Sequence, residues 1–189
     1  TYRMQPNDDS LVMAGTAITV DTCDGDNFPI HVAIYGAKPG YVLVIDGKGY
    51  DGCAYLGDLM GDASKAIGLE GIVIDGLVRD KQGLKNLRLP VYSKGYSPKS
   101  PNKKGPGAIN VPIVCDGVSV NPGDLVVGDC DGVVVVPHEN VKEVLEAAQV
   151  KYDYEIQRRE RIAEYSRRKK ESLELFDLAP GWVRKMEKS

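Results

Sequence analysis

The stretch that decides the fold is YLGDLMGDASKAIGLEGIVIDGLVRD, residues 55–80. Leu59, Ala63 and Ala66 recur within it at the spacing of one helix face, and Gly68 then supplies a typical helix C-cap. The run GIVID follows directly, and its β-branched composition is typical of a buried strand. A helix that leads straight into such a strand belongs to a βαβ unit, so the stretch predicts an α/β fold.

Further short apolar runs, separated by glycine, extend this pattern from Leu11 to Pro137. They predict strands at GTAITV, YVLVID, GIVIDG, VPIVCDGVSV, DLVVGD and GVVVVP. A second helix is predicted at HVAIYGA, after the turn-like GDNFP. The tight turns NPGD and DCDG join the later strands, which we expect to form a meander or a second sheet.

Composition excludes several classes of protein. The net charge of −3 gives no electrostatic case for nucleic acid or an anionic membrane, and the longest apolar run, GVVVVP, is too short to cross a bilayer. The four cysteines form no C-x-x-C pair, which argues against zinc and favours reduced thiols in a cytoplasmic protein over a structural disulfide. The sequence has no initiator methionine, so we expect it to begin partway into a longer chain.

The chain is long enough for one core domain, which we assign to residues 1–150. Residues 151–189 are strongly charged and predict a C-terminal helical extension, either solvated or packed on a neighbouring subunit. Residues 93–107, SKGYSPKSPNKKGPG, form a basic loop. We favour a mobile, solvated loop there over a lid that closes on an anionic ligand.

The βαβ geometry brings the two ends of the opening stretch together. The helix from Asp58 runs about eleven residues, roughly 16 Å at the usual rise. The following strand returns antiparallel to the helix and carries Arg79 and Asp80 back beside its start. This is the edge at which open α/β sheets bind ligands.

The residues at this edge suit a small α-keto acid bound to a divalent metal. Backbone N–H groups of Leu59 and Met60 at the helix start favour an anion, and the planar fork of Arg79 matches a carboxylate. Asp80 offers the hard oxygen that Mg²⁺ prefers. The alternative is that Arg79 and Asp80 form a surface turn and that Asp58 only favours the helix dipole.

Other polar residues near this edge favour structural roles. His31 begins an apolar helical stretch, which indicates a structural histidine more than a site residue. Asp75 and Gly76 indicate a turn rather than a ligand. Tyr50 and Tyr55 flank the expected site and either shape its pocket or pack locally.

The spacing of Asp58, twenty residues and then Arg79-Asp80 resembles the D-x20-R-D motif of class II pyruvate aldolases in the RraA-like family. The runs PGYVLVIDG, GIVIDGLVRD and VPIVCDGVSVNPGDLVVGDCDGVVVVP match as well, and the resemblance covers roughly residues 11–160. It implies a swivelling β/β/α fold with a charged C-terminal helix. It also implies a homotrimer or a hexamer with active sites between subunits, and a further N-terminal segment.

The resemblance also implies residue roles. Arg79 would bind the pyruvyl part of the substrate, Asp80 would anchor Mg²⁺ or Mn²⁺, and Asp58 would act in catalysis. A neighbouring subunit's C-terminal helix would complete the metal site with an acid, for which Glu155 is the first candidate and Glu160 the second. The implied substrate-binding set is Gly57, Asp58, Leu59, Met60 and Arg79.

The implied activity is cleavage of 4-hydroxy-4-methyl-2-oxoglutarate and 4-carboxy-4-hydroxy-2-oxoadipate to pyruvate and a second keto acid, with decarboxylation of oxaloacetate as a companion. Arg79 and a metal ion would stabilise the developing enolate. The alternative is a non-enzymatic regulator of ribonuclease activity that acts by binding protein. That branch has glycine where this chain has Asp58, so Asp58 favours the enzyme.

Overall fold

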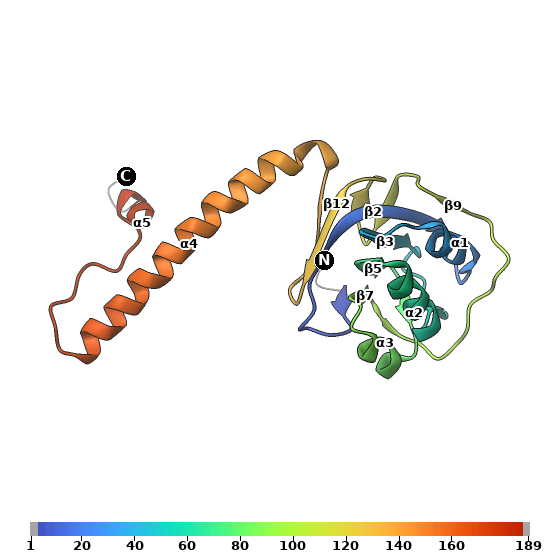
Figure 1. The fold of residues 1–189 in the computed structure, drawn as a ribbon, viewed down its shortest axis with the longest axis horizontal. Helices are drawn as coiled ribbons and strands as arrows, with labels where there is room; N and C mark the ends of the chain where they lie inside the picture. Colours follow the sequence, from blue (N-terminus) through green and yellow to red (C-terminus); the bar gives the residue numbers. More distant parts are fainter. Residues whose placement is uncertain (1–3, 187–189) are drawn as a thin grey trace. The chain divides into compact units, whose positions relative to one another are not determined.

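An eight-stranded sheet organises the first of the two units into which the chain divides. The structure, a computed structural model, describes residues 4–186 (Figure 1). The two units are Thr1–Val141 and Lys142–Ser189, and each is described by itself. The predicted division between residues 150 and 151 falls inside one helix, α4 (Val141–Lys170).

The sheet runs in the order β1-β7-β5-β3-β2-β12-β13, with β9 paired to β2 off this path. Strands β2, β3, β5 and β7 are parallel to their neighbours in this set, whereas β1, β9, β12 and β13 pair antiparallel. Its strands are β1 (Gln5–Pro6), β2 (Met13–Thr22), β3 (Tyr41–Asp46), β5 (Gly71–Ile74), β7 (Val91–Ser93), β9 (Gly107–Ile109), β12 (Leu125–Asp129) and β13 (Gly132–Val136).

The helices of this unit lie together on one side of the sheet (Figure 1). They are α1 (Phe28–Gly36), α2 (Asp58–Ile67) and α3 (Lys81–Leu87), and a short 3₁₀ turn, η1 (His138–Asn140), follows β13. The predicted helices at HVAIYGA and from Asp58 are confirmed by α1 and α2. Gly68 caps α2 in the left-handed conformation at φ 94°, as predicted.

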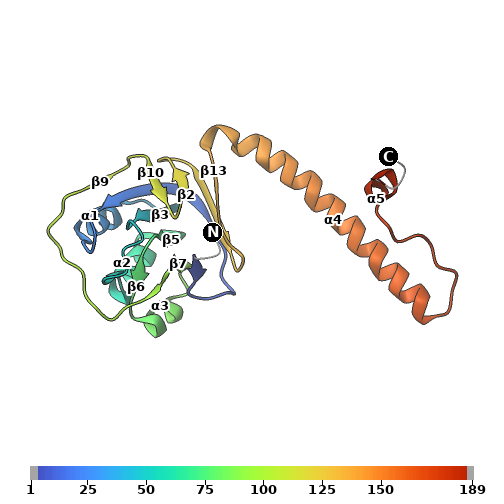
Figure 2. The same cartoon turned by 180° about the vertical axis from the view of Figure 1, so that it is seen from behind.

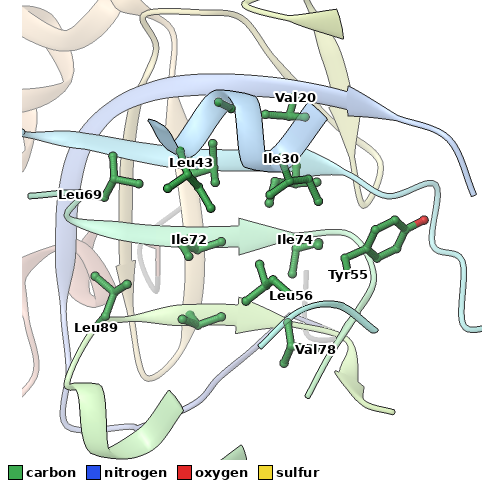
Figure 3. Close-up of a cluster of buried hydrophobic side chains, with 14 of the residues drawn as sticks. Val20, Ile30, Leu43, Tyr55, Leu56, Leu69, Ile72, Ile74, Val78 and Leu89 are labelled. Atoms are coloured by element: carbon green, nitrogen blue, oxygen red, sulfur yellow. The ribbon is translucent and has the colours of Figure 1, made fainter. Parts of the chain in front are cut away.

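Both faces of the central strands are buried, as is usual for parallel strands. On β3, Leu43 and Ile45 point into the core under the helices, while Val42 and Val44 point into a second core on the opposite face. Figure 3 shows the first core, in which residues from β2, β3, β5 and α1 meet Leu56. This alternation explains why the runs between residues 41 and 74 contain few polar residues.

A hairpin covers the second core. Its strands β10 (Ile113–Cys115) and β11 (Val118–Val120) form a separate two-stranded sheet, and β10 contacts β2 and β3 (Figure 2). The run VPIVCDGVSV therefore contains two strands with a turn at Asp116 rather than one. The expected second sheet occurs, whereas β12 and β13 form no meander but a hairpin that joins the main sheet.

A buried ion cluster fastens this hairpin to the end of β5. Lys94 pairs with Asp75 and, at 3.0 Å, with Asp116, and Asp116 N–H donates to Asp75 Oδ2 at 2.9 Å. The three side chains are 21%, 9% and 9% exposed, in that order. Burial alone would lower the pKa of Lys94, but pairing with the two carboxylates outweighs it and raises the pKa. We call Asp75, Lys94 and Asp116 the buried clamp.

The second unit contains α4 and α5 (Gly181–Met186). The predicted charged C-terminal helix is confirmed by α4, none of whose residues is buried. No helix within residues 4–186 is both long and apolar enough to cross a membrane.

Candidate active site

A cleft of about 180 Å³ opens at the start of α2. The predicted residues at the start of α2 and the pair Arg79-Asp80 border it, together with residues of α1 and of the basic loop. Its lining comprises Asn27, His31, Tyr55, Leu56, Gly57, Asp58, Leu59, Met60, Arg79, Asp80, Ser100, Pro101 and Lys103.

A small parallel sheet brings Asp58 and the pair Arg79-Asp80 together. Its strands are β4 (Ala54–Leu56), β6 (Leu77–Val78) and β8 (Gly95–Tyr96), in that order. Leu56 pairs with Val78, and Arg79 N–H donates to Leu56 O at 2.9 Å. Because β4 leads into α2 and β6 leads into α3, the carboxyl ends of both strands meet at one edge. The predicted convergence is confirmed, since Asp58 N–H lies 3.3 Å from Asp80 Oδ2.

Glycine is needed at position 57 because Asp80 lies so close to the start of α2. The backbone conformation is not the reason, because Gly57 is buried and extended and its φ of −136° is open to any residue. A Cβ at this position would overlap Asp80 Oδ2 and lie 3.0 Å from Arg79 Cγ. Only glycine lets the Asp80 carboxylate reach the start of α2.

The Asp58 carboxylate lies between the start of α2 and α3. Its Oδ1 accepts a hydrogen bond from Leu59 N–H at 2.8 Å. Its Oδ2 packs against Gly83, where an added Cβ would lie only 2.5 Å away. The expected free N–H of Leu59 is therefore wrong, because the Asp58 side chain occupies it. Among residues 4–186, the N–H of Met60 has no partner.

Arg79 is held from two sides. Its Nε donates to Asp80 Oδ2 at 3.3 Å and its Nη1 donates to Ser100 Oγ at 2.7 Å. The side chains of Arg79 and Asp80 are 38% and 39% exposed, so both reach water. Asp80 itself adopts a left-handed backbone with φ 58°, and its carbonyl accepts from Leu84 N–H in α3. A non-glycine residue in this conformation is uncommon and recurs at functional sites.

Ser100 belongs to a segment that we call the strap, residues 97–106. Four hydrogen bonds hold the strap over the loop that precedes α1 and over β4. They are Ala54 N to Lys99 O (2.9 Å), Asn27 N to Asn102 O (3.0 Å), Asn102 N to Gly25 O (2.7 Å) and Lys104 N to Asp26 Oδ2 (2.7 Å). The favoured interpretation of this loop as mobile and solvated holds only in part, because most of its residues are exposed but these hydrogen bonds anchor it as one wall of the cleft.

Burial of the Asp26 carboxyl would raise its pKa, but the N–H groups of Lys104 and Phe28 outweigh burial and lower it.

Two polar residues of the cleft were assigned no site role from the sequence. His31 lines the cleft, and its Nε2 is buried without a partner among the described residues, while the structural role favoured above stays a prediction. Asn27 Nδ2 donates to Tyr55 O at 2.8 Å, while its Oδ1 is likewise buried and unpaired. Burial and the nearby charge of Lys103 lower the pKa of His31. The four-residue spacing of Asn27 and His31, which places both on one helix face, was the available signal.

Several predicted residues lie elsewhere. Glu155 is on α4 in the second unit, where it pairs with Lys151 at 3.6 Å, and its role beside a neighbouring subunit stays a prediction. Asp75 belongs to the buried clamp, which agrees with a structural role at this position. Tyr55 is fully buried, which raises its pKa to about 12, and its hydroxyl donates to Gly47 O at 2.8 Å.

Metal ligands at the cleft are few within this chain. Asp80 Oδ2 is occupied by two donors, but Oδ1 has no partner among residues 4–186. One grouping of three ligand atoms occurs among the described residues, at Asp129, Cys130 and Asp131 in the exposed β12–β13 turn, and it does not line the cleft. A metal at Asp80 would therefore rely on water and substrate for most of its ligands, as Mg²⁺ does.

Comparisons with known proteins identify the relatives of this chain. The model of the RraA-like family, described as Aldolase/RraA, matches residues 1–135. A protein of Halalkalibacterium halodurans named "Putative 4-hydroxy-4-methyl-2-oxoglutarate aldolase" is 41% identical over 151 residues, 80% of this chain and 72% of the relative.

Two solved structures share the fold. An uncharacterized protein from Pseudomonas syringae pv. tomato has a TM-score of 0.77 at 30% identity, over 86% of this chain and 78% of its own. The RNA-processing inhibitor RraA from Thermus thermophilis has a TM-score of 0.68 at 28% identity, over 71% and 82%. Because the family model covers residues 1–135 and the Halalkalibacterium halodurans relative is 41% identical over most of the chain, this chain belongs to the RraA-like family.

Proposed function

We propose that this protein is a divalent-metal-dependent lyase. It would cleave 4-hydroxy-4-methyl-2-oxoglutarate and 4-carboxy-4-hydroxy-2-oxoadipate to pyruvate and a second keto acid, and would also decarboxylate oxaloacetate. The observation that carries the proposal is the convergence of Asp58, Arg79 and Asp80 on one cleft. The aldolase name of the Halalkalibacterium halodurans relative supports it.

The residues fit a divalent ion, Mg²⁺ or Mn²⁺, at Asp80. The unpaired Oδ1 of Asp80 is a hard oxygen that reaches water, and hard divalent ions bind through one or two carboxylates with water and substrate. When bound there, the ion would supply positive charge next to the keto group of the substrate.

Arg79 would bind and orient the 2-keto acid. Its Nε and Nη1 are fixed by Asp80 and Ser100, so the guanidinium is held in one plane before substrate arrives. Its Nη2 has no partner among residues 4–186 and can donate to a carboxylate or to an oxyanion. Charge that develops on the pyruvyl oxygen would be stabilised by this preorganised donor.

Asp58 would move the proton. It lies at the cleft beside Arg79 and Asp80, and a carboxylate there, or a water that it orients, can accept the proton of the C4 hydroxyl as the carbon–carbon bond breaks. Lys103 adds a second positive charge to the cleft wall, suited to a further carboxylate of the substrate. The unpaired Asn27 Oδ1 and His31 Nε2 offer polar contacts within the same volume.

The proposed assembly is a homotrimer or a dimer of trimers, in which Glu155 of a neighbouring subunit joins the metal site. Size-exclusion chromatography with light scattering measures the mass of the assembly directly. A monomer at assay concentration would rule out this role for Glu155.

A regulator of ribonuclease activity is the competing hypothesis, and the RNA-processing inhibitor among the similar structures motivates it. The decisive assay measures pyruvate release from 4-carboxy-4-hydroxy-2-oxoadipate and from oxaloacetate, with Mg²⁺, with Mn²⁺ and with EDTA. We expect metal-dependent turnover that Asp80→Ala lowers by at least about a hundredfold.

Asp62→Ala is the matched control, because Asp62 is an exposed acid on α2 that does not line the cleft. It should leave turnover unchanged. Absence of turnover with either substrate and either metal would contradict the lyase proposal and favour the regulator.

A further inference from the structure

The segment after α4 folds back along that helix. Phe176 packs edge-on against Tyr165, with ring centroids 5.7 Å apart, and the guanidinium carbons of Arg161 and Arg168 lie 4.7 and 5.8 Å from its ring centroid. Arg161 Nη2 donates to the backbone oxygen of Asp177 at 2.7 Å. These contacts fix the segment against α4 and place the start of α5 beside it.

A second cleft of about 430 Å³ lies between α4 and this returning segment. We call it the C-terminal cleft. It lies outside residues 1–135, the part of the chain that the family model covers. Its lining comprises Tyr154, Gln157, Arg158, Arg161, Asp177, Ala179, Pro180, Gly181 and Arg184.

Among the described residues that line the C-terminal cleft, positive charge is in excess. Three arginines face one carboxylate, and that carboxylate is already engaged, because Asp177 pairs with Arg184 and accepts from Ala179 N–H at 3.0 Å. Arginine stays protonated at any physiological pH, so burial cannot neutralise the excess.

Arg158 shows where an acceptor is missing. Its Nη1 is shielded from solvent and has no hydrogen-bond partner among residues 4–186. Arg158 as a whole is partly exposed and lines the cleft, so its guanidinium is open to an anion there, and an unpaired charged donor gains from such an acceptor. Arginine forks match the oxygens of phosphates and carboxylates in a bidentate manner.

We propose that the C-terminal cleft binds a small multivalent anion, either a phosphate or a di- or tricarboxylate, with Arg158 as its central ligand. The cleft is large enough for such an ion, and Arg161 supplies further charge beside it. The neutral donors of Gln157 and Tyr154 lie in the same lining and add hydrogen bonds to its oxygens.

The test is isothermal titration calorimetry of the full chain with inorganic phosphate and, separately, with citrate, at constant ionic strength. Arg79 at the candidate active site also attracts anions, so every variant is measured in an Arg79→Gln background. We expect one anion bound per chain, and Arg158→Gln should weaken binding by about tenfold or more. The anion that binds more tightly shows whether the ligand of the cleft is a phosphate or a carboxylate.

Arg159→Gln is the matched control, because Arg159 is the neighbouring, exposed arginine of α4 and does not line the cleft. It removes the same charge and should leave binding unchanged. Arg158→Lys keeps the charge but removes the planar fork, so it should weaken binding even where Arg158→Gln disturbs the helix.

Circular dichroism reports whether each variant keeps its helix content. Equal weakening by Arg158→Gln and Arg159→Gln, unchanged binding in folded Arg158→Lys, or no binding in the Arg79→Gln background would each overturn the proposal.

Discussion

The buried clamp and the candidate active site begin and end the same six-residue segment, residues 75–80, yet they differ in access to water. At one end, the side chains of Asp75 and Lys94 are 9% and 21% exposed. At the other, those of Arg79 and Asp80 are 38% and 39% exposed. Both clusters join a cation to carboxylates at the carboxyl ends of strands, so residue types alone do not separate them.

What separates them is whether a ligand can reach them. In the clamp, two carboxylates share the ammonium group of Lys94 and Asp75 accepts from the Asp116 N–H, and burial closes the cluster to a ligand even though Asp116 Oδ2 has no hydrogen-bond partner among residues 4–186. At the active site, Arg79 Nη2 and Asp80 Oδ1 keep their hydrogen-bonding capacity within residues 4–186. The difference teaches that the clamp stabilises the fold and that the open cluster is available for chemistry.

Breaking the clamp should have the largest effect. Lys94→Met leaves two buried carboxylates without their cation, and removal of one partner from a buried ion pair costs about 3–5 kcal/mol. Urea unfolding followed by circular dichroism measures this loss. The exposed pair between Lys151 and Glu155 supplies the control, and Lys151→Met should cost at most about 0.5 kcal/mol. Similar small losses in both variants would contradict the structural role of the clamp.

Breaking the open cluster should affect activity instead of stability. The Cβ of Gly57→Ala would overlap the Asp80 carboxylate and push it from the start of α2. Displacement of a site residue by about 1 Å can lower turnover about a hundredfold. Steady-state kinetics with oxaloacetate measures it, and Gly36→Ala is the control because nothing lies within 4 Å of its added Cβ. Full activity in Gly57→Ala would mean that the position of Asp80 does not matter.

A milder change moves Asp58 itself. Gly83→Ala places a Cβ 2.5 Å from Asp58 Oδ2 and 2.7 Å from Asp58 Cβ, so the start of α2 must shift together with the carboxylate. Alanine is the better helix former in α3, which offsets only part of the cost of this overlap, so we expect a slightly lower Tm. We also expect about tenfold lower kcat/KM. Unaltered kinetics would exclude Asp58 as a proton acceptor.

The smallest expected effect concerns the anchor of the strap. The folded-state pKa of Asp26 is lowered, so its contribution to stability is present above the unfolded pKa and is lost as pH falls through the folded pKa. Wild type should lose about 1–2 kcal/mol more than Asp26→Asn between pH 6 and pH 3, on account of two hydrogen bonds to a charged group. Parallel stability curves for the two proteins would remove Asp26 as an acid-sensitive anchor.

Local patterns explain what the sequence predicted. GIVID and YVLVID are apolar on both faces, so they could only be central strands, and the helix from Asp58 ends at a glycine that adopts the left-handed conformation. The meeting of Asp58 with Asp80 followed from that βαβ geometry. Its actual cause, the pairing of β4 with β6, involves strands of two or three residues, too short to leave a periodic signal.

The features that the sequence did not predict depend on contacts between distant residues. The strap is fixed by bonds such as Lys104 N–H to Asp26, which lie 78 residues apart. His31 lies on an apolar helix, and only packing decides that its ring faces the cleft rather than the core. Lys94 finds Asp116 through the fold of β10 and β11. Composition at these positions is ordinary, so no local rule marks them.

The anchoring of the strap has an evolutionary consequence. On the strap side, the four hydrogen bonds that anchor it are made by backbone atoms, at Lys99, Asn102 and Lys104. Apart from Ser100, whose hydroxyl accepts from Arg79, the strap side chains at the cleft, such as Lys103, are therefore free to mutate without loosening the wall that they form. Selection can change which substrates this wall accepts while the residues at the other wall, Arg79 and Asp80, stay the same. One scaffold can therefore diversify in substrate through mutations in a single loop.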